Sequence, residues 1–103
     1  MTALQITTTS QEGTTRIALT GELDIATGPD LEHALDAHLA QGDVVLDLRG
    51  VTFIDSSGLR VVLVASRSAT AAGRRLVVVP GDGQVIRVIR LAQVEDRLDL
   101  GDG

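Results

Sequence analysis

Apolar and polar residues alternate with a period of two near the start of the chain, which is typical of strands that bury one face. Residues 4–9 and 15–20 both show this alternation, and the turn residues 11–13 separate them. So short a connection predicts an antiparallel hairpin of two strands. Its threonine-rich surface reflects strand propensity and does not by itself indicate a binding face.

After the hairpin, helical spacing of apolar residues alternates with short apolar runs. Residues 21–24 are expected to form a turn that closes the second strand. The elements predicted next are a helix from Thr27 or Gly28 to residue 41, a strand over 44–48, a helix from Ser56 or Ser57 to Gly73, a strand over 76–79 and a helix over 84–91. Residues 94–100 fit either a short helix or a short strand.

This order of elements predicts an α/β fold. Each strand–helix–strand unit favours parallel pairing with a right-handed crossover, and the hairpin adds one antiparallel pair. We therefore expect a single domain over residues 1–103, with a small mixed β-sheet and helices mainly on one face.

Composition and charge argue against several classes of function. The net charge is −5, there is no basic run and the chain has one aromatic residue, all of which disfavour nucleic-acid binding. The absence of cysteine excludes disulfides, thiolate metal sites and a cysteine nucleophile, and it fits a reducing compartment such as the cytoplasm. No apolar run approaches the roughly 20 residues that span a bilayer, so no membrane span is expected.

The stretch with candidate chemistry follows the strand predicted at 44–48 and reads Asp55-Ser56-Ser57-Gly58. Aspartate and serine are preferred helix N-caps, and a helix N-terminus favours an anion through its unpaired N–H groups and partial positive charge. A serine at this point can carry a phosphate group without disrupting the helix. The residues alone leave two interpretations open: a helix cap and nothing more, or a modified site.

Catalysis by this chain is not expected. Ser56 lacks the glycine two residues before it that a hydrolase nucleophile elbow needs. His33 and His38 are five residues apart, about 140° around a helix, so they do not form a metal pair. The carboxylates of Asp24 and Asp55 leave acid–base chemistry open, but no cofactor motif accompanies them. We therefore expect no catalytic residue, no metal and no cofactor.

Residues 55–59, with residues 45–48 and 53–54 before them, resemble the phosphorylation segment of bacterial anti-sigma factor antagonists, which are STAS-domain switch proteins. Residues 21–24, with the sequence Gly-Glu-Leu-Asp, are similar to a second motif of that family, and their distance from Asp55 along the chain also fits. The resemblance covers residues 4–98 and implies a STAS-like fold.

The resemblance also implies roles for individual residues. Ser56 corresponds to the phospho-acceptor, Ser57 and Gly58 to the helix start, and Asp24 and Asp55 to positions beside the serine that shape kinase recognition. The implied partners are an anti-sigma factor with serine kinase activity, which binds the unphosphorylated protein, and a serine phosphatase that resets the switch. Such a protein regulates sigma-factor-dependent transcription in the cytoplasm.

Two positions depart from the family pattern. Arg60 lies just inside the helix, where many relatives have a small or apolar residue, and Gln93 stands where a glycine is common. Some STAS domains do not switch and instead serve as scaffolds in transport or signalling assemblies. A scaffold is therefore the alternative function, and an enzyme is a third.

Overall fold

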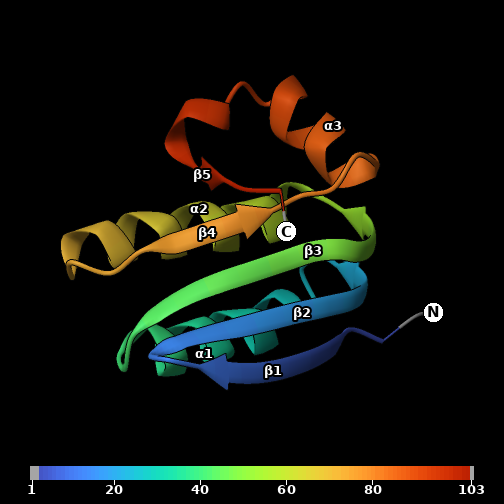
Figure 1. Cartoon of the computed structure of the whole chain (residues 1–103). Helices are drawn as coiled ribbons and strands as arrows, with labels where there is room; N and C mark the ends of the chain where they lie inside the picture. The colour runs from blue at the N-terminus through green and yellow to red at the C-terminus, as the bar shows by residue number, and fades with distance from the viewer. Residues whose placement is uncertain (1–2, 103) are drawn as a thin grey trace.

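The computed structural model describes residues 3–102, which form one β-sheet with α-helices packed against it (Figure 1). The elements in chain order are β1 (Gln5–Gln11), β2 (Thr14–Leu23), α1 (Gly28–Leu39), β3 (Asp43–Ile54), α2 (Ser56–Ala71), β4 (Leu76–Val79), α3 (Gln84–Leu91), the 3₁₀ helix η1 (Glu95–Arg97) and β5 (Asp99–Leu100).

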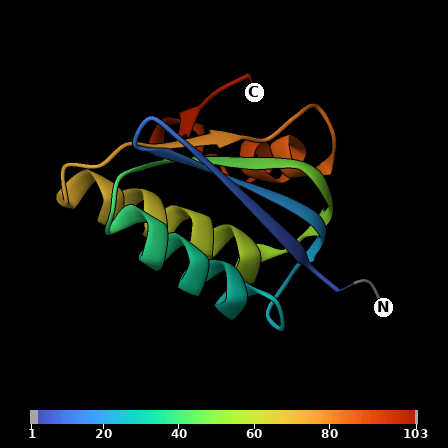
Figure 2. The same cartoon turned by 60° about the horizontal axis from the view of Figure 1, so that its bottom comes forward.

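The sheet is mixed, which confirms the predicted α/β fold. Its strand order is β1-β2-β3-β4-β5, with β1 antiparallel to β2 and every later neighbour parallel. Because each parallel strand is added on the same side of the previous one, right-handed crossovers carry the connecting helices to one face. Figure 2 shows α1 and α2 side by side on that face.

The core lies between the helices and the sheet face that they cover, and its side chains are aliphatic. Residues of α3 extend this core beyond the end of β3. The most buried large side chains are Ile17, Leu19, Leu23, Leu31, Leu35, Leu46, Leu48, Ile54 and Ile89. Within residues 3–102, no helix has the length and apolar character that crossing a membrane requires.

Three strands extend beyond the ranges that the sequence pattern predicts. Strand β1 continues to Gln11, which the pattern assigns to the turn, and the other two corrections concern the candidate site. Strand β2 continues through residues 21–23, which the pattern predicts as a turn, and β3 continues to Ile54 although the pattern ends it at Leu48. The register between the two strands shifts near Gly50, where a methyl group would lie 2.6 Å from the carbonyl oxygen of Leu19. The glycine suggests a strand end but instead lies beside a bulge inside the strand.

The C-terminal segment contains both structures that the sequence leaves open, a 3₁₀ helix followed by the short strand β5. The turn after α3 includes Gln93, whose φ of 59° lies in the left-handed region. Glycine adopts this conformation without steric cost, which explains why glycine suits this position. The departure at Gln93 therefore leaves the turn in place.

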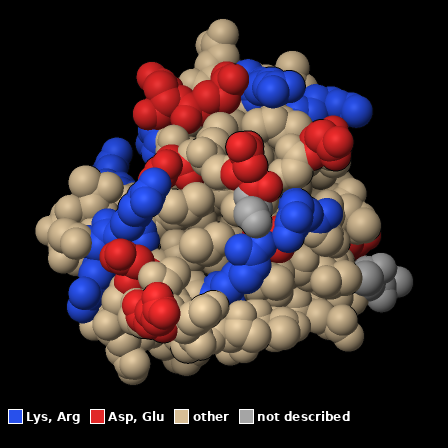
Figure 3. Space-filling view, in the orientation of Figure 1, with Lys and Arg blue, Asp and Glu red and all other residues tan. Residues whose placement is uncertain are grey.

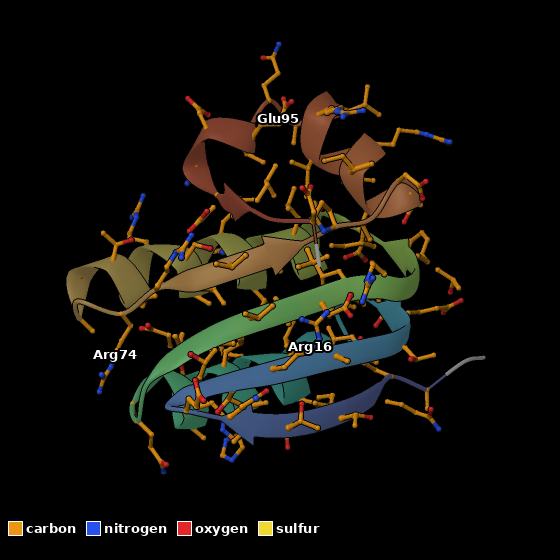
Figure 4. All side chains as sticks on the ribbon, in the orientation of Figure 1. Arg16, Arg74 and Glu95 are labelled. Atoms are coloured by element: carbon orange, nitrogen blue, oxygen red, sulfur yellow. The ribbon has the colours of Figure 1, made fainter. Side chains whose placement is uncertain are left out.

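Arg74 and Arg75 connect the end of α2 to distant parts of the chain. The Arg74 Nε–H donates to the carbonyl oxygen of Leu39 at 3.1 Å, and the Arg75 Nε–H donates to Asp99 at 2.9 Å. Figure 4 shows Arg74 projecting beyond the C-terminal end of α2. Both side chains thus have a structural role.

The sheet face opposite α1 and α2 has an ion triplet across its two central strands. Asp47, which is 8% exposed, accepts hydrogen bonds from Arg16 at 2.9 Å and from the Arg49 Nη2 at 2.8 Å. Figure 4 shows Arg16 reaching from β2 toward β3, and Figure 3 shows acidic and basic side chains mixed on this face. Hydrogen bonds from Arg49 hold the pKa of the Asp47 carboxyl well below its usual range, although burial acts in the opposite direction.

Candidate functional site

The two sequence motifs meet at one edge of the sheet because β2 and β3 are parallel and end there together. Leu23 pairs with Ile54, and the Asp55 N–H donates to the Leu23 carbonyl oxygen at 3.4 Å. Asp24 and Asp55 are thus the residues that leave the two strands. Chain geometry then keeps the Cα atoms of Asp24 and Ser56 within about 16 Å of each other.

Asp55 is the N-cap of α2. Its backbone is extended, with φ −111° and ψ −175°, and its side-chain Oδ1 accepts from the Gly58 N–H at 2.9 Å. Its carbonyl oxygen accepts the first helical hydrogen bond, from Leu59 at 3.0 Å. Of the three cap candidates in the sequence, the aspartate takes this role, and neither serine is needed for it.

Gly58 lets the first turn of α2 lie against the end of β2. A methyl group at this position would be 2.5 Å from the carbonyl oxygen of Leu23 and 2.8 Å from its Cγ. The glycine therefore fixes how closely the helix start approaches the strand end, and with it the position of Ser56 relative to Asp24.

Ser56 is exposed, whereas Ser57 is half-buried. As the first residue of α2, Ser56 lies where unpaired N–H groups and the helix dipole favour a negative charge. Its hydroxyl forms no hydrogen bond with any residue from 3 to 102, so the oxygen is free to react with an approaching group.

Asp24 has a local structural role that the sequence does not reveal. Its Oδ1 accepts from the backbone N–H groups of Ala26 at 3.0 Å and Thr27 at 3.1 Å. The Thr27 hydroxyl donates to the Glu22 carbonyl oxygen at 2.8 Å instead of capping α1. The carboxylate therefore organises the turn from β2 into α1.

Sequence reasoning missed three other residues at this edge. The Gln84 side chain, from the start of α3, accepts from the Ile54 N–H at 2.7 Å and donates to the Ile54 carbonyl oxygen at 3.3 Å.

The other two residues are apolar and exposed. Ile25, which follows Asp24 in the sequence, is 77% exposed, and Phe53, which precedes Ile54, is 42% exposed. An apolar residue in a predicted loop next to a motif is the sequence signal that could have indicated a docking surface, and the structure shows that both side chains are exposed.

His33 and His38 lie in α1, and neither forms a hydrogen bond with Ser56 or Ser57. Residues 3–102 hold no cluster of three or more histidine, aspartate or glutamate side chains that could bind a metal ion. The arrangement presents an exposed hydroxyl at the sheet edge where β2 and β3 end, and this edge also has two acidic residues and two exposed apolar side chains.

Comparison with known proteins gives consistent matches over nearly the whole chain. A family model described as "Mlab, STAS domain" matches residues 6–101. The anti-sigma-B factor antagonist of Staphylococcus aureus is 26% identical over 102 residues, covering 97% of this chain and 94% of the relative. Two solved structures extend the comparison to the fold.

The first of these structures is an anti-sigma factor antagonist from Mycobacterium paratuberculosis. It is 25% identical, with a TM-score of 0.80 over 98% of this chain and 87% of the other. The second, the Bacillus cell fate determinant SpoIIAA in its phosphorylated form, is 20% identical with a TM-score of 0.71, over 96% of this chain and 91% of the other. The second match concerns the fold alone.

Proposed function

We propose, from the fact that this chain belongs to the STAS domain family, that it is an anti-sigma factor antagonist switched by phosphorylation of Ser56. The whole chain, residues 1–103, acts as one STAS domain. When unphosphorylated it binds an anti-sigma factor in the cytoplasm and so frees a sigma factor for transcription. In this role it is a binding protein and a kinase substrate rather than an enzyme.

The observation that carries the proposal is that Asp55, and not Ser56, caps the start of α2. Asp55 caps the helix through its 2.9 Å hydrogen bond from Gly58, which leaves the exposed Ser56 hydroxyl without a structural partner. A hydroxyl with no role in holding the fold can be modified and restored without unfolding the domain. The names of the Staphylococcus and Mycobacterium relatives support the class of partner.

The switch consists of two balanced steps. The anti-sigma factor, acting as a serine kinase, transfers the γ-phosphoryl group of ATP to the Ser56 oxygen, while the hydroxyl proton passes to a base on the kinase and ADP leaves. A serine phosphatase restores the hydroxyl by hydrolysis and releases inorganic phosphate.

Charge explains how the modification separates the partners. A phosphate adds about −1.5 to −2 charges at pH 7, beside the carboxylates of Asp24 and Asp55. The helix N-terminus tolerates this charge, so the fold survives. A partner surface packed against Ile25, Phe53 and Ser56 would have to desolvate the phosphate, and binding is therefore lost.

The test compares three variants with the parent protein in binding to an anti-sigma factor kinase isolated from the same cells. Ser56→Ala should bind and resist phosphorylation, with a stability change within about 0.5 kcal/mol, because Asp55 holds the cap. Ser56→Asp should stay folded and bind more weakly. Ser57→Ala, the matched control, should be phosphorylated like the parent, as measured by intact mass.

Two results would contradict the switch. One is Ser56→Asp binding as tightly as the parent, and the other is phosphate found on Ser57. A second candidate function is a non-switching STAS scaffold in a transport or signalling assembly, which membership of the STAS domain family allows equally. It is supported if no kinase in an extract of the native cells phosphorylates the parent protein.

A further inference from the structure

The exposed side of α2 has a groove that begins one helical turn beyond Ser56. Two adjoining hollows of about 190 and 410 Å³ lie along the helix and reach η1. Leu63, Arg67 and Arg97 line both hollows, while Arg60 and Val64 extend the groove toward the start of α2. We call this surface the α2 groove.

The α2 groove is positively charged on a chain whose net charge is −5. Arg60, Arg67 and Arg97 are exposed, and none of them forms an ion pair with a carboxylate within residues 3–102. Neither hollow is lined by a carboxylate, and Glu95 of η1 instead pairs with Arg90, at 4.0 Å. Figure 4 shows Glu95 at the top of the view, on the side of the molecule where α3 and η1 lie. The groove therefore complements an anionic ligand.

The floor of the groove shows which anion fits. Val64 is 49% exposed, and Leu63 is half-buried beside it, so the arginines surround an aliphatic strip. Ser66 lines the larger hollow, is 8% exposed and has a hydroxyl without a hydrogen-bond partner in the described part of the chain. An aliphatic floor with an unsatisfied hydroxyl matches a peptide, and aromatic side chains that would stack on bases are missing.

We propose that the α2 groove binds an acidic segment of the partner protein, in which carboxylates flank an aliphatic side chain. The identity of that partner as the anti-sigma factor rests on the function proposed above. Guanidinium groups bind carboxylates in a two-pronged geometry, and the aliphatic side chain covers Val64.

The groove is continuous with the switch. Arg60 follows Ser56 by four residues, so the two side chains lie on the same side of α2, one turn apart. A phosphate on Ser56 would attract Arg60 and repel the carboxylates of the docked segment. The arginine that departs from the family pattern thus joins the docking surface to the modified residue.

The first experiment uses the protein alone with a synthetic twelve-residue peptide of glutamates around two central leucines. Isothermal titration should show that Arg67→Gln lowers the affinity roughly five- to tenfold, whereas Arg87→Gln, an equal loss of charge on α3, changes it less than about twofold. Amide NMR shifts should cluster in residues 60–71 and 95–97. Equal losses in both variants, or shifts centred elsewhere, would overturn the proposal.

Other occupants are tested with the same pair of variants. Single-stranded oligonucleotides, vesicles with anionic lipid and self-association of the parent in sedimentation should each show weak binding that Arg67→Gln does not change. If any of them binds more tightly than the peptide and loses affinity in Arg67→Gln, the groove serves that occupant and the proposal is wrong.

The partner protein separates this inference from the switch. If Arg67→Gln weakens binding to the anti-sigma factor and Ser56→Asp does not, the groove stands and the switch fails. If Ser56→Asp weakens binding and Arg67→Gln does not, the switch stands and the groove proposal is overturned.

Discussion

Gly58 shows how a single residue positions the candidate site. A glycine in a helix costs roughly 0.5–1 kcal/mol relative to alanine, so its presence in the first turn of α2 needs a reason. The reason is the 2.5 Å distance that a methyl group would have to the Leu23 carbonyl oxygen. The backbone of β2 occupies the place of the side chain, and the serine that follows Asp55 is held at the sheet edge.

Gly58→Ala should therefore destabilise the protein, by about 1–3 kcal/mol, although alanine is the better helix former. Gly83→Ala is the control, because nothing lies within 4 Å of a methyl group there and its φ is negative. Denaturant unfolding of both variants checks the prediction. A Gly58→Ala protein as stable as the Gly83→Ala protein would show that the helix start does not press on β2.

Local residue chemistry could be predicted where it depends on neighbours in sequence. The cap at the start of α2 follows from Asp55-Ser56-Ser57, although the pattern does not choose among the three. The hydrogen bonds of Asp24 with Ala26 and Thr27 depend on how the turn folds back, and apolar periodicity contains no such information. The role of Asp24 at the serine therefore stays a prediction.

At the scale of elements, the helices and strands before residue 94 were predictable in number and type, but the ends of β2 and β3 and the structure of residues 94–100 were not. Arg49 and Gly50 suggest a strand end, and only the pairing with β2 shows that β3 continues. The contact from Gln84 to Ile54 joins residues that are 30 positions apart. Such long-range polar contacts leave no periodic signal in the sequence.

The hydrogen bonds between Gln84 and Ile54 predict that α3 restrains the end of β3, which leads into α2 and Ser56. Gln84→Ala should speed amide hydrogen exchange of Ile54 by roughly five- to tenfold, since a hydrogen bond contributes about 1 kcal/mol. The Leu46 amide, in the middle of β3, should exchange at the parental rate. Unchanged exchange at Ile54, measured by NMR, would mean that the side chain does not hold the strand in solution.

At the scale of the whole molecule, the sheet has two faces with different means of stabilisation. The helices cover one face and bury aliphatic side chains, whereas the other relies on Asp47 between Arg16 and Arg49. Alternation along β3 predicts that residue 47 points away from the helices, but not that two arginines from different strands converge on it. A buried carboxylate is tolerated there because both cations compensate its desolvation.

Asp47 should make stability depend on acid pH. Hydrogen bonds from Arg49 lower the pKa of the folded-state carboxyl below its ordinary value of 3.8, so between these two values the unfolded chain binds the proton first. The stabilisation is therefore complete above about pH 5 and is lost progressively as the pH falls toward the lowered pKa of the folded state. Asp47→Asn should lower the unfolding free energy at pH 7 by about 1–3 kcal/mol, and the difference in unfolding free energy between the variant and the parent should shrink toward pH 2.

Urea unfolding between pH 7 and pH 2 measures this difference, and Asp36→Asn, at an exposed aspartate, is the control. A difference that stays constant with pH would show that the carboxylate titrates alike in the folded and unfolded chain, and the ion triplet would then have no part in holding β2 against β3.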